Sequence, residues 1–394
     1  SIASGGNYNT VVGDEAGTDI TTGDSNTGVG YGSLNETTTG GSNTAIGVNS
    51  LEANTTGSNN TALGVQALDT NTTASNNTAV GFQSLYANTT GTANVAVGSQ
   101  SGDALTTGHY NTMVGHGSLS ADTKGTRSVA IGMQALAAQN FTSETSAYNT
   151  AVGMSAGAAV TTGQYNTLIG GLAGDAQTTA DHNVALGVST LTTNTKANKN
   201  VAIGSNALNT FNVTSDTDTY NTAVGYSAGG TVTTGTNNTF VGALAGDGTD
   251  DGVGNTCVGK SAGSANLGDN NTLIGLEAGE VATGADNTVM GRSAGITLTS
   301  GSNNLFLGHD SGRSGSPGGN ITTGSNEIVL GDENITEAHI QVDWTVASDA
   351  RDKTDFTPLD LGLDFVNALA PVTYKWDKRS KYGDKSAEGY DLNA

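Results

Sequence analysis

Apolar and polar residues follow one another along this chain in a short, repeated pattern. The pattern is a polar Asn, a Thr, a small residue, an aliphatic residue and a glycine, as in residues 77–81 (Asn-Thr-Ala-Val-Gly). Most neighbouring copies are separated by the same 17-residue step, and the copies close at Gly13, Gly30, Gly47, Gly64, Gly81, Gly98, Gly115, Gly132, Gly153, Gly170, Gly187, Gly204, Gly225, Gly242, Gly259, Gly275, Gly291 and Gly308. A fixed short period predicts a fold built by stacking equal units.

The repeat is broken at few places. Two 21-residue steps end at Gly153 and Gly225, and two 16-residue steps end at Gly275 and Gly291. A degenerate copy closes at Gly331 after a 23-residue step. The longer steps therefore mark insertions into an otherwise regular array.

Each position of the unit has its own chemistry. The residue before the glycine is always aliphatic or Met, as at Val12, Ile46 and Ile203, which predicts a ladder of buried side chains. The preceding residue is often Ala, as at Ala45 and Ala62, and we expect this second face to receive another chain. The glycines themselves predict tight corners.

A 17-residue unit is too small to bury an apolar stripe alone. It contains a Thr-Ala-Val strand, a glycine corner, a second Thr-rich strand and a second turn at segments such as Thr55-Thr56-Gly57. Such units must stack, so the sequence predicts an all-β, parallel β-solenoid with 17-residue rungs. At about 4.8 Å per rung, some 18 rungs give a rod on the order of 85 Å long.

An Asn recurs at one position of each rung, as at Asn9, Asn26, Asn43 and Asn60. Stacked Asn side chains can form a ladder of amide hydrogen bonds. Alternatively, each Asn merely tolerates the backbone conformation of a turn. The sequence leaves both interpretations open.

The composition changes after Gly331. We expect a solenoid shaft over residues 1–331, a neck strand over 332–347, where apolar and polar residues alternate, and the start of a small α+β domain over 348–394. The last segment carries half of the Lys and Arg residues, and a helix is expected between Pro358 and Pro371.

Charge excludes several classes of function. The chain has 14 Lys and Arg against 36 Asp and Glu, a net charge of -22. An acidic surface repels phosphate, so nucleic acid and anionic membranes are not expected as partners. No stretch is long and apolar enough for membrane insertion. The single Cys257 excludes an internal disulfide, and the chain is expected to be a piece of a longer protein.

The two four-residue insertions are the candidate binding sites. Each adds one Phe, and each is followed by a Tyr, at Tyr148 and Tyr220. Insertions in a solenoid form loops on one face, which often bind partners. We therefore select Phe141, Tyr148, Phe211 and Tyr220 as binding residues; the alternative is that the insertions only relieve packing or break edge pairing. No cofactor or metal site is expected, because the five His residues are scattered.

The repeats resemble the head repeats of a known class of fibrous protein. Ser-Val-Ala-Ile-Gly at 128–132 and the Asn-Thr-Ala-Val-Gly units, over residues 9–331, are similar to those of trimeric autotransporter adhesins of the YadA type. The resemblance implies left-handed parallel β-rolls that associate as trimers.

A second resemblance covers the end of the chain. Residues 347–353 (Ala-Ser-Asp-Ala-Arg-Asp-Lys), with Pro-Val-Thr-Tyr at 371–374, resemble the start of the intramolecular chaperone of endosialidase-type phage tailspikes and fibres, the S74 peptidase family. This resemblance implies trimerisation and self-cleavage just before Ser348, with Ser348 as nucleophile and Lys353 as its base. Asp352 stands where the family commonly has a hydrophobic residue, and a pair with Lys353 would keep that base protonated.

Together the resemblances imply a homotrimeric, extracellular shaft of a bacteriophage tail fibre or related virion appendage that supports host-surface attachment. Its expected partners are two further copies, other virion tail proteins, and a host cell-surface glycan or protein receptor. No activity on an external substrate is expected. The alternatives are a bacterial trimeric surface adhesin, which needs a membrane anchor or stalk, and a glycan-cleaving tailspike, which needs paired carboxylates in a groove.

Overall fold

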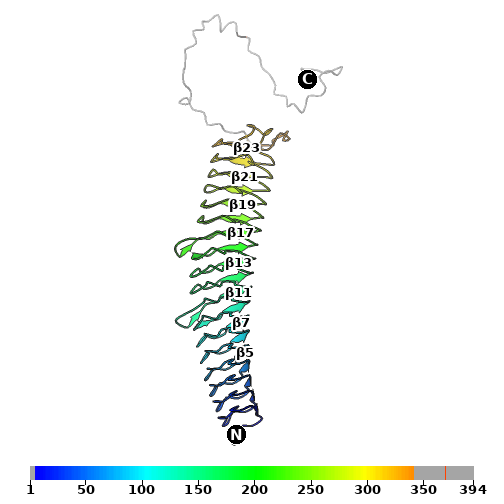
Figure 1. Cartoon of the computed structure of the whole chain (residues 1–394). Helices are drawn as coiled ribbons and strands as arrows, with labels where there is room; N and C mark the ends of the chain where they lie inside the picture. The colour runs from blue at the N-terminus through cyan, green and yellow to red at the C-terminus, as the bar shows by residue number, and fades with distance from the viewer. Residues whose placement is uncertain (1–4, 341–368, 370–394) are drawn as a thin grey trace, which may run out of the picture. The chain divides into compact units, whose positions relative to one another are not determined.

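The computed structural model describes residues 5–340 and residue 369. The chain divides into two units, Ser1–Thr336 and Glu337–Ala394. The first unit is a stack of rungs that each contribute one short strand (Figure 1). Residues 5–340 contain no helix, so none of them forms an apolar helix that could cross a bilayer.

The stack is built on one parallel sheet of 19 strands. Its strands are β1 (Thr10–Val12), β2 (Thr27–Val29), β3 (Thr44–Ile46), β4 (Thr61–Leu63), β5 (Thr78–Val80), β6 (Val95–Val97), β7 (Thr112–Val114), β9 (Val129–Ile131), β11 (Thr150–Val152), β12 (Thr167–Ile169), β13 (Val184–Leu186), β15 (Val201–Ile203), β17 (Thr222–Val224), β18 (Thr239–Val241), β19 (Thr256–Val258), β20 (Thr272–Ile274), β21 (Thr288–Met290), β22 (Leu305–Leu307) and β23 (Ile328–Leu330). Two further pairs of strands lie outside this sheet, namely β8 (Gly125–Thr126) with β10 (Thr145–Ser146), and β14 (Ala197–Asn198) with β16 (Thr217–Asp218).

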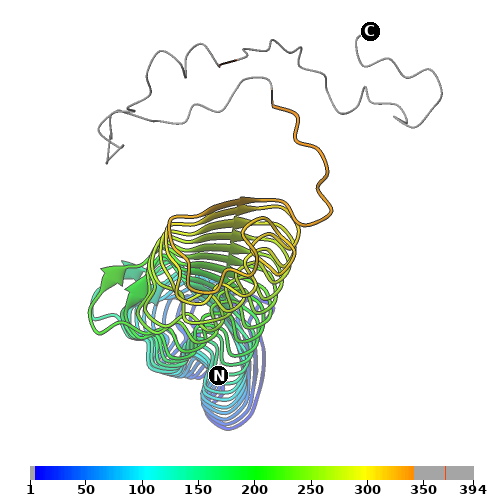
Figure 2. The same ribbon diagram turned by 90° about the horizontal axis from the view of Figure 1, so that it is seen from above.

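Equivalent residues of successive rungs lie directly opposite one another. In β3 and β4, Thr44 pairs with Thr61 and Ile46 with Leu63, and the same register holds along the sheet. Viewed along the stack, the rungs superimpose (Figure 2). The predicted parallel β-solenoid is thus confirmed, and the interpretation of the glycine spacing as one rung per repeat is correct.

The expected second strand is absent from most rungs of the described chain and forms only as the short strands β8, β10, β14 and β16. The Thr-Thr-Gly segment bends the chain, which confirms the predicted second turn of the rung, and its threonines form a ladder of their own. The hydroxyl of Thr38 donates to the carbonyl of Thr55 at 3.0 Å, and the hydroxyl of Thr55 donates to that of Thr72 at the same distance. Side-chain hydroxyls thus supply part of the bonding that a second strand would have made.

The predicted buried ladder was placed on the wrong face. Ile46 and Leu63 are 39% and 44% exposed, whereas Ala45 and Ala62 are fully buried. Successive side chains of a strand point to opposite faces, so the middle residue of each three-residue strand points inward. The Ala column is therefore the core and cannot receive another chain, and the aliphatic column that includes Ile203 lies on the outside.

Inward-facing residues of one rung compensate for one another in size. The position four residues after the closing glycine is a buried Leu in many rungs, such as Leu68, and a glycine in others. Where it is Gly157, the buried Val160 lies beside it, and a Cβ on Gly157 would lie 3.3 Å from that side chain. Where it is Gly246, the ring of Phe240 takes the space, and an added Cβ would lie 2.2 Å from the ring. Such compensation keeps the core filled.

The corner glycines are required by both conformation and space. Gly47 has a φ of +139°, and a Cβ there would lie 2.4 Å from the carbonyl oxygen of Gly64 in the next rung. Side chains rarely adopt this conformation. The glycine column therefore allows adjacent rungs to approach closely.

The Asn column is a buried ladder, which decides between the two interpretations of this residue. Asn43 Oδ1 accepts from the backbone N–H of Asn60 at 2.9 Å, and Asn43 Nδ2 donates to the carbonyl of Gly57 at 2.9 Å. These bonds mostly join side chain to backbone, so the ladder satisfies the buried corner of each rung.

The main sheet ends at β23. Residues 332–340 contain a turn and no strand, and the rest of the predicted neck, residues 341–347, lies outside the described residues. So do the predicted helix up to residue 368 and the segment from residue 370 onward.

Candidate functional site

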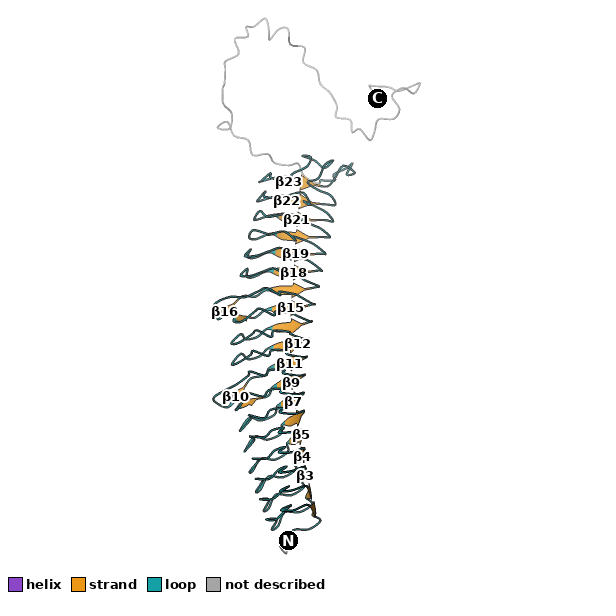
Figure 3. Ribbon diagram, in the orientation of Figure 1, coloured by secondary structure: helices purple, strands orange, loops and turns teal. Residues whose placement is uncertain are grey.

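Each of the two 21-residue rungs carries one additional short strand, which pairs with a short strand of the 17-residue rung before it. β8 pairs in parallel with β10, and β14 with β16. Both pairs lie on the same side of the stack, where the loops that carry β10 and β16 protrude (Figure 3). Both insertions therefore protrude from the same face of the solenoid.

The two inserted phenylalanines do not lie on that face. Phe141 is 5% exposed, and Phe211 is fully buried as part of the main hydrophobic core. They anchor the loops, because burial of a ring favours the inward position. Their selection as binding residues is therefore corrected.

Tyr148 and Tyr220, by contrast, are exposed by 50% and 52%. Each stands directly before a buried Asn of the Asn ladder, at a corner of its rung. The same corner is occupied by a large side chain in seven consecutive rungs. These residues, called here the aromatic–cation ladder, are Tyr110, Arg127, Tyr148, Tyr165, His182, Lys199 and Tyr220.

Much of the ladder is a continuous stack. Tyr148 and Tyr165 have ring centroids 5.7 Å apart with 15° between their planes, and Tyr165 and His182 are 4.7 Å apart at 26°. The guanidinium of Arg127 lies 5.4 Å from the ring of Tyr110 and 5.7 Å from that of Tyr148. Arg127 therefore joins two aromatic residues by cation–π contacts.

The far end of the ladder carries an ion pair. Lys199 Nζ lies 5.4 Å from the ring of Tyr220 and 2.5 Å from Asp218 Oδ2. The hydrogen bond with Asp218 raises the pKa of Lys199 and lowers that of Asp218. Both side chains are in solvent, so the pair holds the geometry of β16 more than it stabilises the fold.

Five members of the ladder were not predicted from the sequence, because the prediction considered only the insertions. Tyr110, Arg127, Tyr165, His182 and Lys199 belong to the same column but lie outside the inserted segments. The available signal was the column before the repeated Asn, which after Tyr8 stays small as far as Ala93, changes to large residues at Tyr110 and returns to small ones after Tyr220. A scan of every column would have found it.

Two half-buried carboxyl groups outside the ladder, Asp69 and Asp103, have raised pKa values. Burial and the neighbouring Glu52 raise the pKa of Asp69 to about 6. Burial also raises the pKa of Asp103, which lines a shallow depression of about 260 Å³ beside His116. Neither carboxyl lies in a deep cleft with a second carboxylate, so the geometry that glycan cleavage needs is not formed by these two residues.

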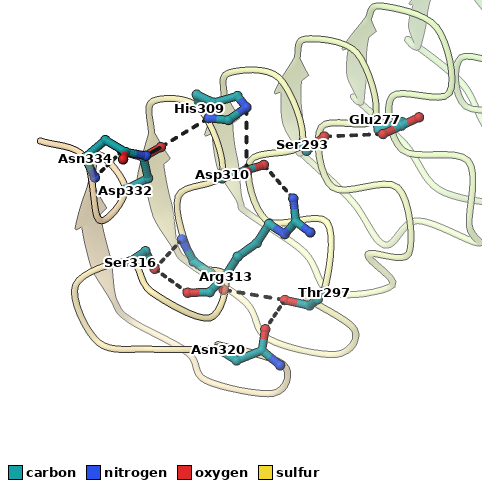
Figure 4. A network of polar contacts seen from close by, with 11 residues as sticks. Glu277, Ser293, Thr297, His309, Asp310, Arg313, Ser316, Asn320, Asp332 and Asn334 are labelled. Atoms are coloured by element: carbon teal, nitrogen blue, oxygen red, sulfur yellow. Dashed lines mark hydrogen bonds and ion pairs between the residues drawn. The ribbon is translucent and has the colours of Figure 1, made fainter.

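A polar network closes the last rung (Figure 4). His309 Nδ1 lies 3.2 Å from Asp332 Oδ2, and Arg313 donates to Asp310 at 2.6 Å. The contact with His309 lowers the pKa of Asp332. Thr297 donates to Asn320 of the last insertion at 2.8 Å. These contacts tie the irregular 23-residue step to the rungs beneath it, and within residues 5–340 no three ligating side chains converge as a metal site.

The predicted nucleophile Ser348 and base Lys353 lie outside the described residues. Residues 348–390 match the family model described as the chaperone of endosialidase. A search of curated proteins finds no match to the chain. The resemblance at the end of the chain is thus supported, while the identity of the solenoid rests on its structure alone.

Proposed function

We propose that three copies of this chain associate side by side to form the shaft of a phage tail fibre or related virion appendage, which supports attachment to a host surface. The observation that carries the proposal is the outward column of the main sheet. Because this column is aliphatic or Met in every rung and is nowhere fully buried, the shaft has an apolar stripe along its length that solvent reaches.

The stripe consists of the residues before the closing glycines, which are exposed in some rungs and partly exposed in the others. Val29, Leu186 and Met290 are 37%, 41% and 45% exposed. Apolar residues of the column after the glycine widen it, as at Val65 and Phe82, which are 43% and 48% exposed. Continuous apolar patches of this kind are rare on monomers and mark protein–protein contacts.

A second copy of the chain fits the stripe better than an unrelated partner does. Copies have the same rung spacing, so aligned shafts match apolar rows over the whole length. Each chain also carries a charge of -22, so close association requires an apolar surface that offsets repulsion between the copies. The match of residues 348–390 to a chaperone of endosialidase supports three copies, since that resemblance implies trimerisation.

The test is the mass of the full chain in solution, measured by light scattering. We expect a trimer for the wild type and dissociation for the double variant Leu63→Asp/Leu186→Asp, which places charges in the stripe. Asn237→Asp adds a charge to an exposed corner outside the stripe, and we expect it to remain trimeric. A folded wild-type monomer would overturn the proposal.

Self-cleavage before Ser348 is a separate part of the proposal. Its support is the Ser-Asp-Ala-Arg-Asp-Lys sequence at 348–353 inside the matched segment. In Ser348→Ala we expect a wild-type fragment that begins at residue 348 to disappear, and in Lys353→Ala we expect the same result because the base is lost. Asp352→Leu is expected to speed cleavage, since removal of the carboxylate lowers the pKa of Lys353. Cleavage that survives Ser348→Ala would remove this residue from the mechanism.

A further inference from the structure

The aromatic–cation ladder occupies a position that carries small residues in the neighbouring rungs on both sides, and outside the ladder only Tyr8, in the first rung, is large among the described residues. In the rungs that flank it the same corner carries Ser25, Ser42, Asn59, Asn76 and Ala93, and then Asn237, Gly254, Asn270, Asp286, Asn303 and Asn326. The seven consecutive large residues are therefore confined to one continuous segment, between Tyr110 and Tyr220.

The backbone at this corner does not favour large side chains. All seven ladder residues have positive φ, from 50° at Tyr148 to 61° at Tyr110. Gly adopts this region freely and Asn or Asp tolerate it, whereas other side chains are strained there. Buried residues such as Leu68 adopt positive φ as well, but they fill the core. The ladder residues are exposed, so their strained backbone is not offset by core packing, which points to a role at the surface.

Charge changes over the same segment. Residues 1–108 contain eight acidic residues and no Lys or Arg. Residues 109–220 contain six acidic residues and three His, together with Lys124, Arg127, Lys196 and Lys199. The shaft is strongly acidic except here, so an anionic ligand is repelled least along this segment.

The orientation of the ladder decides how a ligand would lie. Ring faces of Tyr148, Tyr165 and His182 stack on one another, so their edges and polar atoms point outward. In the described part of the chain, the hydroxyls of Tyr148 and Tyr165 have no hydrogen-bond partner, and the guanidinium of Arg127 bonds only the hydroxyl of Ser146, at 2.5 Å. Six rung steps at about 4.8 Å give a row of polar groups about 29 Å long.

We propose that this ladder binds a linear anionic polysaccharide that runs along the shaft. Carboxylates of acidic sugars would accept from Arg127, His182 and Lys199, and sugar hydroxyls would bond the phenol groups. A donor in every rung matches a polymer with one polar unit per sugar. The pairs β8–β10 and β14–β16 lie next to the ladder at Arg127 and Lys199. They would limit sideways movement of the bound polysaccharide. The inference rests on the proposed role of the shaft in surface attachment.

The experiment replaces ladder residues by the residue that the fold prefers at this corner. The variant is Arg127→Asn/Tyr148→Asn/Tyr165→Asn in the full chain. The matched control is Tyr8→Asn, because Tyr8 is exposed, has a φ of 60° and stands in the same column outside the ladder. Binding is measured by calorimetry with polygalacturonate, hyaluronate and heparin as anionic probes and with dextran as the neutral probe.

We expect wild type and control to bind at least one anionic probe, more weakly at high salt, and not dextran. The triple variant is expected to lose at least tenfold in affinity while its melting temperature stays the same or rises. Equal binding by wild type and triple variant, binding of dextran alone, or no binding of any anionic probe would overturn the inference. Light scattering separates this result from the proposed trimer: a triple variant that dissociates would show that the ladder contacts another copy instead.

Discussion

The buried and exposed columns of the same rung differ in how they vary along the shaft. The buried positions carry few residue types along the whole shaft: mostly Asn at the corner, and complementary large and small residues in the core. The outward corner next to the Asn changes from small residues to the aromatic–cation ladder and back. A buried column must match both its neighbours, because an unfilled volume or an unsatisfied polar atom costs free energy at every level.

Exposed residues do not have to pack against both neighbouring rungs. Their residue types therefore indicate which molecules the surface contacts. The aliphatic stripe is uniform over the whole shaft, as a contact with a copy of the same length requires. The aromatic–cation ladder is restricted to seven rungs, as a contact with a separate ligand requires. The comparison therefore separates the features that build the solenoid from those that we assign to assembly and binding.

The strongest test of the comparison uses two adjacent residues of β15. We expect Ala202→Asp to destabilise the shaft by about 3–5 kcal/mol, because it leaves an unpaired charge in the core. Ile203→Asp places the same charge on the outer face, and we expect a loss of about 1 kcal/mol or less within one chain. Thermal unfolding followed by circular dichroism, at a concentration where both variants are monomeric, measures the difference. Equal melting temperatures would show that the faces are assigned wrongly.

A second pair tests the Asn ladder against its exposed neighbour. Asn238 Oδ1 accepts from the backbone N–H of Asn255 at 2.8 Å, and Asn238 Nδ2 donates to Gly252 at 2.8 Å. Asn238→Gly leaves both backbone groups buried without these partners, and we expect a cost of about 2–3 kcal/mol. Asn237→Gly is the control, since Asn237 is exposed with a φ of 60°, which Gly adopts readily. Denaturant unfolding of the two variants is expected to differ clearly.

The sequence predicted the fold class because its strongest signal, a glycine with a 17-residue period, is a direct consequence of rung-to-rung contact. It could not predict which strand face points inward, because the strands are three residues long and both Ala45 and Ile46 are apolar. The exposed Tyr148 and Tyr220 were found through the insertions. The rest of the ladder was missed because Arg127 or His182 alone is an ordinary surface residue, and only stacking in three dimensions makes these residues one site.

Cys257 offers a chemical probe of the buried columns. It replaces Ala in mid-strand and is fully buried, and this burial raises the pKa of its thiol. We expect no reaction with a thiol reagent at pH 8 in the folded chain and fast reaction in denaturant, because the thiolate is the reactive form. In Cys257→Ala/Thr22→Cys the new thiol lies on the exposed surface, where labelling is expected within minutes. Rapid labelling of Cys257 in the native chain would mean that this rung opens readily.

The smallest expected effect is a change of stability with pH at a side chain that is neither fully buried nor fully exposed. Asp69 is half-buried, and burial together with Glu52 raises its pKa from 3.8 to about 6. The folded state therefore holds a proton that the unfolded state has released between these values, so stability falls as the pH rises through about 4 to 6. Because solvent screens the group, we expect a change in melting temperature of only about one degree. Asp69→Asn is expected to remove this dependence, and Glu52→Gln to reduce it by removing the neighbouring charge. If Glu52→Gln left the pH profile unchanged, burial alone would set the pKa of Asp69, and acidic residues of adjacent rungs would not be coupled across the stack.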